Sequence, residues 1–131
     1  MSDALTGAVV YDTGALLAAE RANPRIIKLH QQLGQHRIRP LVPVVVLAQA
    51  WRGGPQHRMS RLLRGCDIVP DDEQLGRTAG IACAAAGTSD VVDALVVVLA
   101  ARIGALVVTS DPDDLLHLAD ALGLKLRVVV V

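Results

Sequence analysis

The sequence predicts an α/β fold with a mainly parallel central sheet, in a single domain that spans residues 1–131. Short apolar runs of β type alternate with longer segments of helical composition along the whole chain, which is the pattern of repeated strand–helix units. The chain has 131 residues, of which 52% are hydrophobic, and this is enough for one substantial core. The carboxyl ends of parallel strands form the edge of the sheet at which ligands bind.

Five short runs are expected to be strands, because each is apolar and is bounded by turn residues, proline or charge. They cover residues 8–11, 39–42, 66–69, 105–108 and 126–131. The run from Pro43 to Trp51 is ambiguous. Its valines favour a strand, whereas the proline at its start and the glycines at 53 and 54 after its end favour a helix.

The segments between these runs have helical composition. The expected helices begin near residues 13, 24, 56, 71, 90 and 113. The helix that covers residues 91–101 is the most informative, because Asp93 is the only charge in an otherwise apolar segment. Such a helix is expected to be buried, and a buried carboxylate needs a partner or a metal ion. Thr88 and Ser89, just before this helix, are expected to cap its N-terminus.

The charges are unevenly distributed, although they sum to zero. Residues 1–65 contain nine Lys or Arg and three acids, whereas residues 66–131 contain four Lys or Arg and ten acids. A basic half beside an acidic half fits a protein that holds a polyanion on one side and a cation on the other. The alternative is that the charges only cover solvated helix faces. The acids at 71–73, 113 and 114 are expected to be solvated, and the histidines are expected at the surface.

The cysteines and the hydropathy pattern concern the compartment. Cys66 and Cys83 are too few and too isolated for a disulfide framework or a zinc site, so we expect two buried thiols. No basic segment precedes the first apolar run, as a signal peptide would require. The longest uncharged runs are twelve residues long, against about 20 for a membrane span. We therefore expect a cytoplasmic protein that makes no contact with membranes.

Four acids define the candidate site. Asp12 follows directly after one expected strand, and Asp111 lies in the short segment where another stops, so in a parallel sheet they emerge at the same edge. Asp90 and Asp93 are three residues apart and lie on one face of the first helical turn. Converging carboxylates repel one another unless a divalent cation lies among them, and Mg²⁺ prefers oxygen ligands. Each acid also has a structural interpretation, as a helix cap or as a first-turn acid. We interpret the set as a metal site.

Four segments in this order resemble the PIN domain. They are VVYDTGALLAAE, VPVVVLAQAWRGG, DVVDALVVVLAARIGA and VVTSD. The resemblance is closest to the VapC-type toxins of bacterial toxin–antitoxin pairs, and it covers essentially the whole chain. It implies a three-layer α/β/α fold and a ribonuclease that depends on Mg²⁺ or Mn²⁺. It also implies an RNA substrate and a small antitoxin protein as partner, and a homodimer is considered as well.

The resemblance assigns roles to particular residues. Asp12, Asp93 and Asp111 match the acids that bind the metal and carry the catalysis, and Thr109 matches the hydroxyl residue two positions before the last acid. The family usually has Glu where this chain has Gln49. An amide can ligate a metal ion, but it has no charge and cannot act as a base. Asp90 is the acid that can supply the missing charge.

Two other functions compete with a nuclease. The first is a PIN-like module without catalysis, or with weak activity, that binds RNA or a partner protein, with Gln49 marking the loss. The second is a phosphoacceptor receiver domain, which is disfavoured because residues 7–10 lack an acidic pair and no lysine follows the last expected strand. Trp51 and Arg52 follow the central helix and could contact an RNA strand, but we favour a tryptophan that anchors the boundary of the core.

Overall fold

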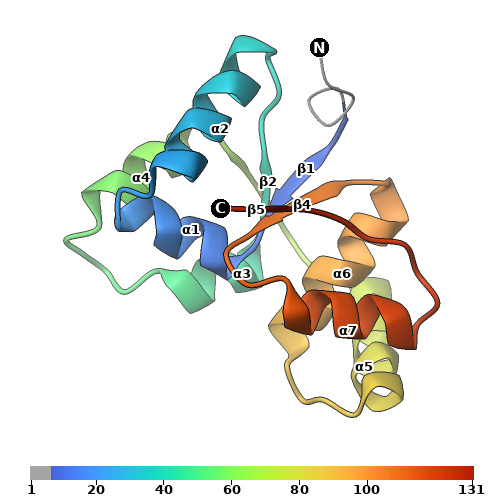
Figure 1. Ribbon diagram of the computed structural model, residues 1–131. Helices are drawn as coiled ribbons and strands as arrows, with labels where there is room; N and C mark the ends of the chain where they lie inside the picture. The colour runs from blue at the N-terminus through green and yellow to red at the C-terminus, as the bar shows by residue number, and fades with distance from the viewer. Residues whose placement is uncertain (1–6) are drawn as a thin grey trace.

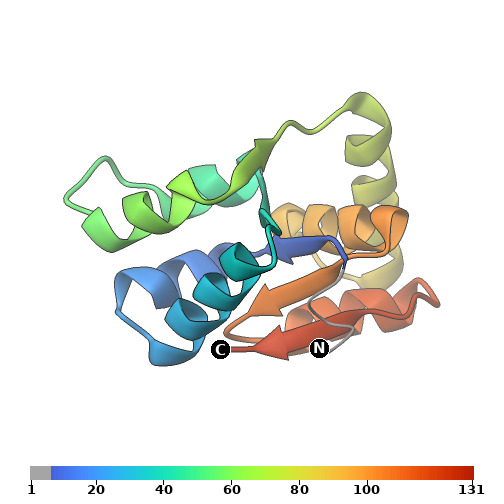
Figure 2. The same cartoon turned by 90° about the horizontal axis from the view of Figure 1, so that it is seen from above.

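In the computed structural model, which describes residues 7–131, five parallel strands form one sheet in the order β3-β2-β1-β4-β5. The strands are β1 (Val9–Tyr11), β2 (Leu41–Pro43), β3 (Asp67–Val69), β4 (Leu106–Thr109) and β5 (Arg127–Val130). Val10 of β1 is aligned with Leu41 on one side and with Val107 on the other. Figure 2 shows β5 (red) at one edge of the sheet and β3 (green) at the opposite edge. The predicted parallel sheet is confirmed.

Helices cover both faces of this sheet. They are α1 (Thr13–Glu20), α2 (Pro24–Gln35), α3 (Val44–Ala50), α4 (His57–Arg64), α5 (Glu73–Ala86), α6 (Val91–Ile103) and α7 (Asp113–Ala121). Figure 1 shows α1, α2, α3 and α4 on one side of the strands and α5, α6 and α7 on the other. The protein therefore has the expected three-layer α/β/α architecture.

The strand order explains why the two groups of helices lie on opposite faces. The chain passes from β1 to β2 to β3 in one direction across the sheet, and then returns to β4 and β5 on the other side of β1. Crossovers between parallel strands are nearly always right-handed, so a reversal of direction moves the connecting helices to the opposite face. The reversal makes the boundary between β1 and β4 the switch point, where α/β proteins bind ligands.

The core follows from the apolar runs. Every residue of β1 and β4 is buried, as expected for central parallel strands that are covered on both faces. The stretch of α6 from Ala94 to Ala100 is buried throughout, so the predicted burial of this helix is confirmed. Cys66 and Cys83 are buried free thiols, also as predicted.

Two local expectations are decided by the structure. The ambiguous central run is a helix, and Pro43 is both the last residue of β2 and the N-cap of α3. The cap of α6 was assigned to the wrong residue, because Asp90 is the N-cap and its side chain accepts a hydrogen bond from the backbone N–H of Asp93. Thr88 lies before the cap, and its hydroxyl accepts a hydrogen bond from the N–H of Asp90 (3.2 Å).

Hydropathy along the helices bears on membrane insertion. Among residues 7–131, no single helix is both long enough and apolar enough to cross a bilayer. The two helices α5 and α6 reach that length and composition only when taken together, and they are bent by 113° relative to each other.

Candidate metal centre

Asp12 lies at the switch point, directly after β1. It is the N-cap of α1, where its Oδ1 accepts a hydrogen bond from the N–H of Ala15 (2.9 Å). The residue is only 6% exposed. Burial raises the pKa of Asp12, the charge of Asp111 adds to the rise, and hydrogen bonds from the Thr109 side chain and from the backbone of Ala15 and Gly14 partly offset it. Asp12 is thus both the N-cap of α1 and a buried carboxylate at the ligand-binding edge of the sheet.

The end of β4 comes very close to the start of α1. A Cβ atom on Gly14 would collide with the hydroxyl of Ser110 and would lie 3.1 Å from the Ser110 backbone nitrogen. A glycine is needed here because any side chain would push the two segments apart. Gly14 therefore allows Asp12 and the β4–α7 loop to share one small region, a contact that the sequence pattern does not reveal.

Asp93 is the most perturbed acid of the site. It lies half-buried in the first turn of α6, one turn after the N-cap Asp90. Burial, followed by the charge and hydrogen bonding of Asp90 and the charges of Asp12 and Asp114, raises the pKa of Asp93 to about 7. The first turn of α6 is therefore close enough to the end of β1 for Asp12 to affect Asp93, as the interpretation of the four acids as one site requires.

The tightest group of carboxylates is Asp90, Asp93 and Asp114. One carboxylate oxygen from each residue lies within 4.8 Å of the other two. The sequence predicted Asp90 and Asp93 in the site but treated Asp114 as solvated. Asp114 is exposed, yet its position in the first turn of α7 brings it to the first turn of α6. The available signal was its spacing of three residues from Asp111, which puts it one turn further along the same segment.

Asp111 has a more peripheral position than expected. Thr109, the last residue of β4, is fully buried, and its hydroxyl accepts from the N–H of Asp111 and donates to its carbonyl oxygen, both at 3.1 Å. The single proton of this hydroxyl can turn toward that carbonyl or toward Asp12, whose pKa it lowers. The Asp111 carboxylate is exposed and accepts from the N–H of Asp113 (3.4 Å). Asp111 thus acts on Asp12 through its charge and is not one of the three clustered acids.

Gln49 is held beside the start of α1. Its side chain is exposed, and the hydroxyl of Thr13 donates a hydrogen bond to its Oε1. Thr13 directly follows Asp12, so the amide of Gln49 lies on the α3 side of the acidic region. The sequence did not indicate Thr13 as a site residue.

The donor set suits a hard divalent cation. The clustered acids offer carboxylate oxygens, and the additional groups nearby are the Asp12 carboxylate and the Gln49 amide. Oxygen ligands without thiolate or imidazole are typical of Mg²⁺, Mn²⁺ and Ca²⁺. A cation bound among these carboxylates would offset the repulsion that contributes to the raised pKa of Asp93.

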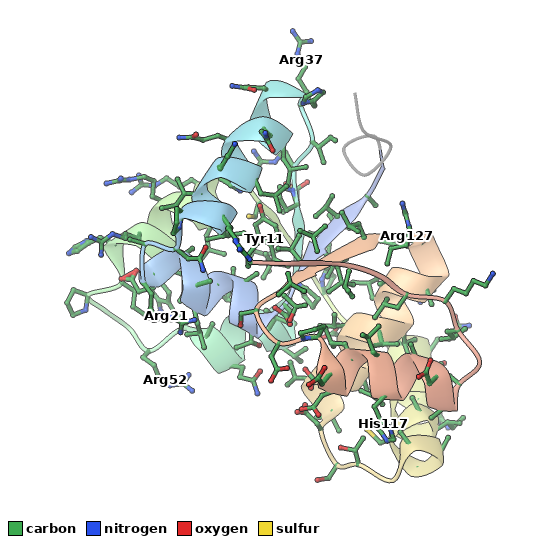
Figure 3. All side chains as sticks on the ribbon, viewed as in Figure 1. Tyr11, Arg21, Arg37, Arg52, His117 and Arg127 are labelled. Atoms are coloured by element: carbon green, nitrogen blue, oxygen red, sulfur yellow. The ribbon has the colours of Figure 1, made fainter. Side chains whose placement is uncertain are left out.

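Two expectations about polar residues outside the site were wrong. Asp71 was expected to be solvated, but both of its carboxylate oxygens are buried and have no hydrogen-bond partner within the described chain. His30 was expected at the surface, but it is half-buried, and its Nδ1 lies 2.8 Å from the hydroxyl of the fully buried Tyr11. Figure 3 shows Tyr11 in the middle of the molecule, between the two helical layers.

Comparisons with known proteins support the fold alone. No protein-family model matches the sequence, and no curated protein matches it either. The structure is similar to one described as "Crystal Structure of PAE2754 from Pyrobaculum aerophilum", with a TM-score of 0.61, over 95% of this chain and 90% of that chain. The two sequences are 16% identical. The chain therefore shares a three-layer α/β/α fold with that protein.

Proposed function

We propose that this protein is a metal-dependent endoribonuclease of the PIN type, resembling the VapC toxins, which hydrolyses RNA phosphodiester bonds. The observation that carries the proposal is the convergence of carboxylates from separate elements at the switch point of the sheet. Oxygens of Asp90, Asp93 and Asp114 lie within 4.8 Å of one another, and Asp12 is close enough to raise the pKa of Asp93. Structural caps alone would not need this crowding, which costs stability.

Some of these residues would bind the metal ion, and others would support the ion site. Asp93, Asp90 and Asp114 would hold the ion, with Asp12 on its β1 side, while Asp111 keeps the surroundings acidic. Mg²⁺ or Mn²⁺, when bound, supplies a Lewis acid that activates water and stabilises negative charge on a phosphoryl oxygen. Thr109 fixes the backbone at Asp111 and limits the pKa of Asp12. Gln49 and Thr13 border the same region from α3 and α1.

Cleavage of RNA with Mg²⁺ or Mn²⁺, against an EDTA control, tests the proposal directly. Asp93→Asn should lower the metal-dependent rate by roughly a hundredfold, because it replaces a charged carboxylate ligand with a neutral amide. Asp120→Asn is the matched control, since Asp120 is an exposed acid on α7 outside the acidic cluster, and its rate should be unchanged. Cleavage that persists in EDTA, or that is equal in all three proteins, would contradict the proposal.

A second candidate is a PIN-like module that binds RNA or a protein with little or no catalysis. Gln49 favours it, because an amide replaces the acid of the resembled family and is engaged by Thr13. Gln49→Glu separates the two candidates in a calorimetric Mn²⁺ titration and a cleavage assay. If Asp90 already supplies the charge, the wild type is active and the added acid leaves affinity and rate flat or lower. If Gln49 limits the site, the variant binds Mn²⁺ more tightly and gains cleavage.

A partner protein belongs to the proposal. A cavity of about 250 Å³ lies between α1, α2 and α4, and its lining includes Ile27, Leu62, Arg58 and Arg61. On α2, Ile27 is 40% exposed and available to a partner, whereas Ile26 and Leu33 are fully buried in the protein's own core. We infer that a small antitoxin-like protein places a helix with apolar and acidic residues here. A basic tail on that protein could reach the acidic cluster.

A further inference from the structure

A second cavity, of about 380 Å³ and wide open to solvent, lies between α3 and α4. Its lining consists of Leu47, Trp51, Ser60, Leu63 and Arg64. The two leucines and the indole ring form apolar walls, while Ser60 and Arg64 add a hydroxyl and a guanidinium group. Trp51 is 38% exposed and is the only tryptophan in the chain. The ring is therefore partly covered at the boundary of the core and partly open to solvent, where a ligand can contact it.

The cavity and the acidic site lie on opposite sides of α3. Leu47 and Trp51 are four residues apart and share one face of the helix, whereas Gln49, midway between them, lies on the other face. Gln49 contacts Thr13 beside Asp12. One helix diameter, about 10 Å, therefore separates the cavity from the border of the acidic site, a distance that roughly three stacked nucleotides cover.

The charges around this cavity indicate an anionic ligand with a flat apolar part. No acid lines the cavity, and within residues 7–131 neither Arg52 nor Arg64 takes part in an ion pair. Arg52 follows Trp51 and donates to the carbonyl oxygens of Ala48 (3.1 Å) and Trp51 (2.8 Å), which fixes its guanidinium at the C-terminal end of α3. Figure 3 shows Arg52 at the periphery, on the side of the N-terminal helices. A purely apolar ligand would leave both positive charges without a counter-charge.

We propose that this cavity binds a base of single-stranded RNA, stacked on Trp51, with the adjoining phosphates neutralised by Arg64 and Arg52. Aromatic stacking beside cationic side chains is the usual means of holding a single strand. The inference rests on the proposed function, because the strand is the one whose scissile bond would lie at the acidic cluster. Binding at Trp51 needs no cleavage, so the two can be tested separately.

The emission of the sole tryptophan reports directly on the cavity. A short single-stranded RNA of mixed sequence, titrated at low salt in EDTA, should quench this emission until it saturates. In parallel, the anisotropy of the same RNA carrying a dye gives Kd. Trp51→Leu should weaken binding by about tenfold, whereas Trp51→Phe, which keeps a stacking ring, should retain most of the affinity. A thermal melt verifies that each variant is folded.

A matched pair of arginine variants tests the contribution of charge to RNA binding. Arg64→Gln should weaken RNA binding and lower the slope of log Kd against log salt by about one. Arg77→Gln removes the same charge from α5, where Arg77 pairs with Glu73 (2.8 Å) in the opposite layer, and should leave Kd unchanged. The inference is wrong if RNA binds without quenching, or if Trp51→Leu and Trp51→Phe bind RNA as well as the wild type. The proposed nuclease would survive that result, provided that metal-dependent cleavage persists.

A second copy of the chain is the competing occupant. In that case the tryptophan emission would change with protein concentration in the absence of RNA, and size exclusion would show a dimer that Trp51→Leu dissociates. This outcome would overturn the RNA assignment and would make the cavity a self-association surface. Quenching by RNA of a protein that elutes as a monomer supports the assignment.

Discussion

Asp93 couples the stability of the protein to pH. Its pKa is about 7 in the folded state, raised first by burial and then by Asp90, Asp12 and Asp114, whereas an aspartate in an unfolded chain titrates near pH 4. Between these values the folded state holds a proton that the unfolded state has released. The free energy of unfolding of the metal-free protein therefore falls as pH rises from about 4 to about 7.

We predict that Asp93→Asn removes this fall in the free energy of unfolding with rising pH. At pH 8 in EDTA, the variant should be more stable than the wild type by on the order of 2 kcal/mol, after allowance for screening at a half-buried site. Mn²⁺ should raise the melting temperature of the wild type by mass action on the folded state, and it should do so much less in Asp93→Asn. Chemical denaturation at pH 5 and pH 8, with and without Mn²⁺, measures both effects. A wild-type melt that does not respond to Mn²⁺ would count heavily against the site.

Residues of the candidate site were predictable where the neighbouring sequence alone indicates their environment. Asp12 was evident from its place after a strand, and Asp93 from its apolar surroundings on a buried helix. Asp114, Thr13 and Ser110 were not predictable, because their relevance comes from the packing of α7 on α6 and from the close approach at Gly14. Contacts between segments far apart in the chain leave no local pattern in a single sequence.

At the scale of elements, the predictable parts were those with a single dominant signal. Central strands such as β1 and β4 are short apolar runs that end in polar residues, and they lie where expected. The valine-rich segment of α3 gave conflicting signals, because its β propensity opposes the bracketing by Pro43 and Gly53. The helix forms there, and its residues Val46 and Ala50 pack into the core. Tertiary burial therefore decided the conflict.

The start of α3 has an unusual neighbour in Asp71. The helix has no side-chain cap of its own, and the alignment of Pro43 with Val69 brings the residues after β3 beside its first turn. Both Asp71 oxygens are buried without a hydrogen-bond partner in the described chain. Burial, followed by the charge of Asp72, raises the pKa of Asp71. The nearby N–H of Val45 offsets this rise only in part, because it makes no hydrogen bond of good geometry to either oxygen. The charge of Asp71 thus destabilises the fold above its normal pKa.

We predict that Asp71→Asn stabilises the protein at pH 8 by on the order of 1 kcal/mol, because it removes a buried charge and keeps an oxygen near Val45. The gain should vanish toward pH 3, where the wild-type carboxyl group is protonated. Urea denaturation at several pH values measures it, and Asp120→Asn again serves as the exposed control. If Asp71→Asn is instead less stable at pH 8, the charge is a favourable cap for α3.

At the scale of the whole molecule, the charge split of the sequence becomes a split between layers. The basic first half forms α1 to α4, and the acidic second half forms α5 to α7. The ends of β1 and β4, with the acidic cluster, lie at the boundary between them. We expect this split to attract a polyanion to one layer and a cation to the other, and a partner that carries both charges could engage the two together.

This arrangement predicts how a partner would silence the protein. A small protein with an apolar and acidic helix should bind over Ile27, Leu62, Arg58 and Arg61, and an arginine of its basic tail should displace Mn²⁺ from the acidic cluster, because guanidinium pairs well with carboxylates. Co-expression with the neighbouring open reading frame, followed by size exclusion, should give a complex that binds Mn²⁺ more weakly than the free chain. Arg58→Glu with Arg61→Glu should release the partner, whereas Arg77→Glu, in the opposite layer, should not. If the chain elutes alone and binds Mn²⁺ equally well with or without that neighbour, the inhibition mechanism is wrong.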